Sequence, residues 1–152
     1  MKFIPSDLTC EKEIVKSMNS ESAWMRKQGL DFTMPSKSIE QEYDQIKLQI
    51  VAKAVEAEWK KHGQDFFENL GLLLGKKISG DYQVCFTNYG PAGFYNLPNE
   101  VYLNINFIDE FDPVESVKHE IIHLLIEPFV IKKKLGHETK EDLVDTILKA
   151  VG

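Results

Sequence analysis

The stretch DPVESVKHEIIHLLI, residues 112–126, is the most clearly marked helix in the sequence. Asp112 is a good N-cap, Pro113 suits the first helical position, and Glu115 completes a capping box. Because Pro128 cannot continue a helix, we expect this one to end at about the last residue of the stretch.

The same stretch contains the pattern H-E-x-x-H. Residues four apart share one helix face, about 6 Å apart along the axis. The imidazoles of His119 and His123 can therefore converge on one ion, at about 2.0–2.1 Å each if the ion is zinc. Glu120 follows the first histidine, so its carboxylate can reach a water on the same metal and act as a general base. The pattern predicts a Zn²⁺ site with Glu120 as its catalytic residue.

A catalytic zinc site needs a third protein ligand. Glu127 is unsuitable, because it lies eight residues from His119, about 12 Å along the axis if the helix persists. His137 lies in a polar linker and could fold back towards the histidines. Glu141 is the preferred ligand, in the first turn of the next helix and eighteen positions after His123.

Asp145 lies four residues after Glu141, so the two carboxylates share one face of that helix. A histidine that binds a metal usually donates its other ring N–H to a carboxylate. Asp145 is therefore expected to orient one of the two histidines.

The remaining sequence predicts an α+β chain. Strands are expected where aromatic and β-branched residues cluster or alternate, and helices where apolar residues follow helical spacing. Gly63 and Gly75 are expected to end helices, and Thr139 with Asp142 forms a second potential capping box. The expected helices are residues 11–28, 39–61, 65–74 and 140–149, the expected strands are 82–87 and 101–107, and residues 88–99 are expected to form a Gly/Pro/Asn loop.

The composition fits one domain of 152 residues. A formal net charge of −6 argues against nucleic-acid binding, which needs a basic face. The apolar runs are too short to span a membrane, and the first residues lack the apolar segment of a signal peptide. Cys10 and Cys85 are interpreted as reduced thiols. We therefore expect a cytoplasmic protein.

H-E-x-x-H on one helix followed by Glu-x-x-x-Asp on the next resembles the gluzincin metallopeptidases, especially their minimal single-domain members. The resemblance is specific over about residues 115–148, loose over 39–112, and absent from 1–37. It implies a zincin-like single domain over residues 1–152: a small sheet, an active-site helix, a glutamate-bearing helix and extra N-terminal helices. It leaves residues 1–37 as an N-terminal helical arm.

The resemblance also implies roles and a substrate. It makes His119, His123 and Glu141 the metal ligands, Glu120 the general base, and Asp145 the carboxylate that orients the first histidine. The reaction would be peptide-bond hydrolysis in a peptide or protein substrate. By analogy, an extended peptide would bind by strand addition to an edge strand, for which residues 101–107 are the candidate.

Two features depart from the family pattern. Lys140 stands directly before the glutamate ligand, where other members often have Asn. No motif identifies the residue that steadies the oxyanion, and the candidates are Tyr89, Tyr95, Tyr102 and His137.

Two other functions stay open at this point. One is a non-catalytic binding module with a structural or vestigial zinc site, in which His137 would be a fourth ligand. The other is a helical interaction protein whose histidines are core residues. Residues 1–37 either pack as an extra helix or cover the cleft, with Cys10 reaching the metal.

Overall fold

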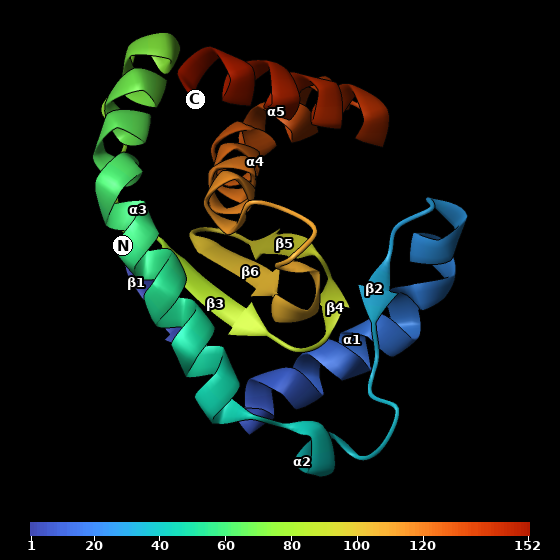
Figure 1. Cartoon of the computed structure of the whole chain (residues 1–152). Helices are drawn as coiled ribbons and strands as arrows, with labels where there is room; N and C mark the ends of the chain where they lie inside the picture. The colour runs from blue at the N-terminus through green and yellow to red at the C-terminus, as the bar shows by residue number, and fades with distance from the viewer.

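A four-stranded mixed sheet lies at the centre of the computed structural model, which describes residues 1–152 (Figure 1). The first three strands in the order β1-β3-β6-β5 are parallel, and the last strand is antiparallel to its neighbour. The strands are β1 (Lys2–Pro5), β3 (Gln83–Thr87), β6 (Glu100–Asn104) and β5 (Gly93–Asn96), and a separate two-stranded sheet pairs β2 (Phe32–Thr33) with β4 (Gly90–Pro91).

The edge strands of this sheet are β1 and β5, so the prediction that residues 101–107 form an edge strand was wrong. β6 is paired on both sides, with β3 and with β5, and it ends at Asn104, where residues Ile105–Phe107 form the short helix η1. The expected loop 88–99 instead supplies β4 and β5. Its Gly and Pro content favours a loop, but backbone hydrogen bonds to β6 override that local preference.

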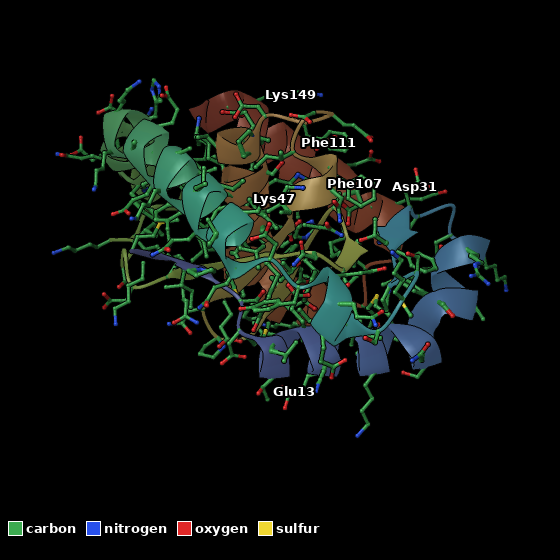
Figure 2. All side chains as sticks on the ribbon, turned by 60° about the horizontal axis from the view of Figure 1, so that its bottom comes forward. Glu13, Asp31, Lys47, Phe107, Phe111 and Lys149 are labelled. Carbon is green, nitrogen blue, oxygen red and sulfur yellow. The ribbon has the colours of Figure 1, made fainter.

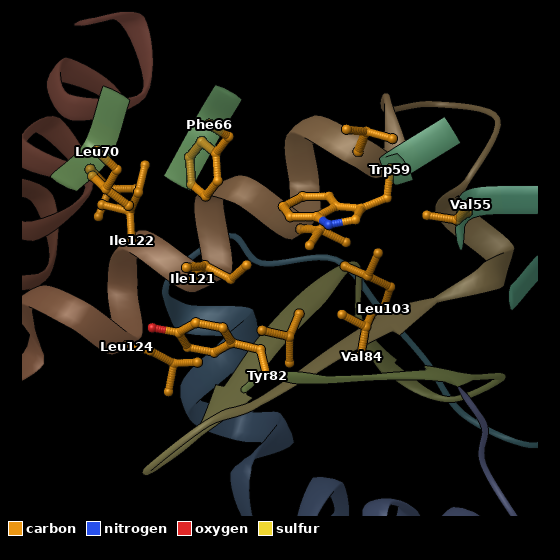
Figure 3. Packing of buried hydrophobic residues seen from close by; sticks show 14 of the residues in the cluster. Val55, Trp59, Phe66, Leu70, Tyr82, Val84, Leu103, Ile121, Ile122 and Leu124 are labelled. Carbon is orange, nitrogen blue, oxygen red and sulfur yellow. The ribbon is translucent and has the colours of Figure 1, made fainter. Parts of the chain in front are cut away.

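Helices α3 (Gln45–Leu74) and α4 (Pro113–Lys133) pack on one face of the sheet, and α5 (His137–Val151) packs against both of these helices. Figure 3 shows side chains of α3 facing those of α4, with sheet residues beside them. Val84, Leu103, Ile121 and Phe66 are among the most buried members of this core. Helix α4 therefore lies inside the protein, with the sheet below it and helices around it.

Helix α3 is continuous, whereas the sequence predicted a break at Gly63. A Cβ at Gly63 would collide with the indole of Trp59, so this glycine permits close packing within the helix. The separate four-residue helix α2 (Ile39–Glu42) precedes α3. Gly75 has a left-handed backbone and ends α3, as predicted.

Helix α4 begins as predicted, because the Asp112 carboxylate accepts hydrogen bonds from two backbone N–H groups of the first turn. It does not end near residue 126, since Pro128 lies inside it. The side chain of Val130, beyond the proline, is buried in the core. This packing offsets the backbone hydrogen bond that proline lacks.

Helix α5 begins at His137, three residues earlier than expected, with Gly136 at its N-cap. Thr139 is therefore inside the helix and forms no capping box with Asp142, which was a wrong prediction. His137 belongs to the first turn of α5 and not to a linker.

Residues 1–37 are only partly the expected helical arm. Residues Lys2–Pro5 form strand β1 of the main sheet, and helix α1 (Leu8–Lys27) follows. Figure 1 shows α1 on the side of the sheet away from α4 and α5. Its apolar side chains form a second cluster with Phe94 and Tyr102, whose rings stack 4.6 Å apart. None of the helices is both long enough and apolar enough to cross a membrane.

A buried glutamate attaches α1 to the sheet. The Glu11 side chain has no exposed surface, and its Oε1 accepts hydrogen bonds from the Ser6 hydroxyl and from the backbone and side-chain N–H groups of Asn88. Its Oε2 is buried without a partner. Burial therefore raises the pKa of Glu11, and the hydrogen bonds oppose this only in part.

We predict that Glu11→Ala destabilises the protein by about 1–3 kcal/mol, because it leaves the Ser6 and Asn88 donors unpaired. Glu11→Gln keeps the acceptor and removes the buried charge. A folded-state pKa raised above the ordinary value contributes stability at low pH that is lost as pH rises through the folded pKa. The parent protein should therefore lose stability relative to Glu11→Gln as pH rises above about 4, the ordinary pKa of a glutamate. Denaturant unfolding measures both effects, and a pH-independent difference would contradict the assignment.

Candidate metal centre

Two histidines project from successive turns of α4. The Nε2 atoms of His119 and His123 lie 3.0 Å apart, and their rings meet edge to face. The His123 side chain is almost fully buried, and its Nδ1 has no hydrogen-bond partner. The helical spacing seen in the sequence is thus realised, with both Nε2 atoms facing one point.

Helix α5 brings a carboxylate to the same point. Val144, Ile147 and Val151 are buried against the core, which fixes α5 across α4. Glu141 Oε2 then lies 3.4 Å from His119 Nε2 and 3.3 Å from His123 Nε2.

The three atoms fit a divalent metal. Ligands at about 2.0–2.1 Å in a tetrahedral zinc site are separated by about 3.3–3.4 Å from one another. The distances in this structure are 3.0, 3.3 and 3.4 Å. His119, His123 and Glu141 together could hold a metal ion, and two imidazoles with one carboxylate form a donor set typical of zinc sites that keep an open position.

The charges around this point also suit a cation. Burial tends to lower the pKa of His119, but the Glu141 carboxylate and other acids nearby outweigh it and raise that pKa. Burial lowers the pKa of His123. Burial opposes ionisation of Glu141, yet hydrogen bonds with both imidazoles hold its pKa well below the ordinary value. Glu141 is therefore ionised at neutral pH, and neutral His123 has a free electron pair for a metal.

Asp145 and His137 lie at the edge of this group. Asp145 Oδ1 is 3.7 Å from His119 Nδ1, on the side of the ring away from the convergence point. This distance is too long for a hydrogen bond, so the orienting role of Asp145 stays a prediction. His137 Nδ1 is 3.4 Å from the other oxygen of Glu141, and its ring meets Trp24 of α1 edge to face. His137 is not a member of the group of converging ligand atoms.

Glu120 points from α4 towards the edge strand. Its side chain is buried, and burial raises its pKa to about 7. A Cβ on Gly93 would lie only 2.6 Å from Glu120 Oε1. The absence of a side chain at Gly93 therefore allows the carboxylate to approach β5.

The contacts of Tyr95 in β5 could not be predicted from the sequence. Its ring stacks on His123 with centroids 5.2 Å apart, and its hydroxyl donates to Glu127 at 2.6 Å. Glu127 is thus a partner of Tyr95, in agreement with its rejection as a ligand. The hydroxyls of Tyr89 and Tyr102 donate to other carboxylates, and their rings belong to the α1 cluster.

A pocket of about 350 Å³ adjoins the histidine-bearing turn. His119 and Glu120 line one side of it, and the other side is largely apolar. Figure 2 labels two of the apolar residues, Phe107 and Phe111, in the segment before α4. The pocket gives the centre a neighbouring space that fits one bulky apolar group.

Comparison with models of protein families, with curated proteins and with solved structures finds no match for this chain. The resemblance to gluzincins therefore stays a prediction. Its support consists of the motif in the sequence and the convergence of three side chains from two helices.

Proposed function

We propose that this chain is a zinc-dependent metallopeptidase with a zincin-like single domain. The observation that carries the proposal is the convergence of His119 Nε2, His123 Nε2 and Glu141 Oε2, with distances of 3.0–3.4 Å between these atoms. A buried carboxylate, Glu120, stands beside them on the same helix. These are the parts that metal-assisted hydrolysis of an amide needs.

A zinc ion bound by these ligands would supply a Lewis acid that lowers the pKa of water and polarises a carbonyl. Glu120 would accept a proton from the attacking water as the water oxygen bonds to the carbonyl carbon. When the C–N bond breaks, Glu120 would return that proton to the leaving amine. Burial raises the pKa of Glu120 above that of an ordinary glutamate, which favours its uptake of a proton.

The surroundings support a peptide as the substrate. β5 is the last strand of the sheet, so one of its edges has no strand partner. An extended peptide can add to such an edge through backbone hydrogen bonds. The 350 Å³ pocket beside His119 and Glu120 would accept an apolar side chain next to the cleaved bond.

We predict about one zinc per chain by elemental analysis of the purified protein. Loss of a residue that only hydrogen-bonds to a metal ligand weakens metal binding by roughly 10–100-fold. Glu141→Ala should weaken zinc binding by more than this. His137→Ala should keep the metal, and His62→Ala, at an exposed position on α3, controls for loss of a histidine. If His137→Ala removed zinc and Glu141→Ala did not, the ligand set would be wrong, and so would the assignment to gluzincins.

Glu120→Gln tests the catalytic role directly. The amide has the same shape and cannot accept the proton, so turnover of a zinc-dependent peptide substrate should fall by about 10²–10⁴-fold. Zinc content should not change, because Glu120 is not a ligand. Turnover at the parent rate in a zinc-loaded Glu120→Gln protein would refute the mechanism.

Gly93→Ala tests the approach of Glu120 to β5. The new methyl group would displace the flexible end of Glu120 and leave the backbone unstrained, so folding should change by less than about 1 kcal/mol. Turnover should fall by about 10–100-fold, since a displacement near 1 Å can cost that much. The matched control is Gly80→Ala, where the nearest atom to an added Cβ is 3.9 Å away. Equal turnover in the two variants, measured with equal zinc content, would contradict this geometry.

A further inference from the structure

The proposed hydrolysis needs a donor for the negative charge that develops on the carbonyl oxygen. The candidates named from the sequence do not supply it. Tyr89 and Tyr102 donate to carboxylates elsewhere, and His137 faces the outer oxygen of Glu141. Tyr95 lies beside the histidines, but its hydroxyl already donates to a carboxylate.

Lys140 is the cation at the centre. Its side chain is largely buried, and its Nζ lies 3.4 Å from the Tyr95 hydroxyl oxygen and 5.6 Å from the centroid of that ring. The same Nζ is 4.0 Å from Glu141 Oε1. The ammonium therefore lies between the ring that stacks on His123 and the carboxylate that converges with both histidines.

The arrangement around this ammonium combines side chains from three elements. Tyr95 comes from β5, Glu127 from α4 and Lys140 from α5. The tyrosine ring is fixed by its stacking on His123, and its hydroxyl is fixed by the 2.6 Å hydrogen bond to Glu127. The oxygen of that hydroxyl can then accept from Lys140. An ammonium has three N–H donors, so the contacts with Tyr95 and Glu141 leave at least one for another partner.

We propose that the Lys140 ammonium donates a hydrogen bond to the carbonyl oxygen of the substrate as that oxygen becomes negative, and that Tyr95 and Glu127 position the ammonium. The inference rests on the proposed peptidase function. Glu120 takes the water proton as the new C–O bond forms, and the carbonyl oxygen carries the charge. The C=O bond then re-forms, the C–N bond breaks, and the amine takes the proton from Glu120, while Lys140 only donates its hydrogen bond. A charged donor in a water-poor site is well suited to this task.

Lys140→Met should lower kcat by about 10²–10³-fold, the cost of removing one such donor. KM and zinc content should change little, because the lysine acts after the substrate has bound. Lys149→Met is the matched control, on an exposed position of the same helix (Figure 2), and should keep the parent kcat. Methylammonium added to Lys140→Ala should restore part of the activity, and it should not restore activity to Glu120→Gln.

A binding measurement separates this role from catalysis itself. A peptide phosphonate carries a negative tetrahedral centre like the one that forms during hydrolysis. Calorimetry on the zinc-loaded protein measures the Kd of the phosphonate. In Lys140→Met this Kd should rise by about the same factor as kcat falls. Binding of the uncleaved peptide, measured with Glu120→Gln as the background, should hardly change on adding Lys140→Met.

The positioning role of Tyr95 has its own signature. Tyr95→Phe keeps the ring on His123 and removes the hydroxyl, so it should lower kcat by less than Lys140→Met and keep zinc. Because Tyr95 acts through Lys140, the two losses should not add in the double variant.

The outcomes distinguish the inference from the function on which it rests. If Lys140→Met has the parent kcat and the parent activity depends on Glu120, the role of Lys140 is overturned and the proposed peptidase function stands. Loss of zinc in Lys140→Met also overturns it, since the lysine would then only balance the charge of Glu141. A parent protein without zinc-dependent hydrolysis overturns both.

Discussion

The burial of helix α4 is the constraint on which the candidate centre depends. The sheet lies on one side of this helix, and α3 and α5 cover the others. Val117, Ile121 and Ile122 have no exposed surface. Polar groups on a helix in this environment are costly unless they find partners. His123 and Glu120 are both buried here, so the protein must satisfy them from neighbouring elements or from a bound ion.

The edge strand contributes to the centre through the two-residue period of a β-strand. Gly93 and Tyr95 lie two apart on β5, so both face α4. At the first position the absence of a side chain makes room for the Glu120 carboxylate. At the second a large ring stacks on His123 and carries a hydroxyl to Glu127. The short strand β5 thus shapes the space around Glu120 and around His123. This accounts for the glycine at position 93 of the strand.

The candidate centre contains several acidic side chains and one lysine. Glu120, Glu127, Glu141 and Asp145 surround the two histidines, which favours a cation between them. Lys140 is the positive side chain among these acids, and it lies against Tyr95. The proposed function needs both signs of charge at separate points, because it requires a bound cation and a developing anion. The spacing between Glu141 Oε2 and the Lys140 ammonium, which contacts the other oxygen, provides that separation.

The sequence by itself determined the features that depend on neighbours along the chain. The start of α4 follows from the cap at Asp112, the end of α3 from Gly75, and the shared face of His119 and His123 from their spacing of four. Only the tertiary structure decided that Gly63 and Pro128 lie inside helices, that β5 is an edge strand, and that Lys140 contacts Tyr95. These outcomes depend on packing and pairing between segments far apart in the sequence. Local preferences of about 1–3 kcal/mol are too small to resist such contacts once a core forms around them.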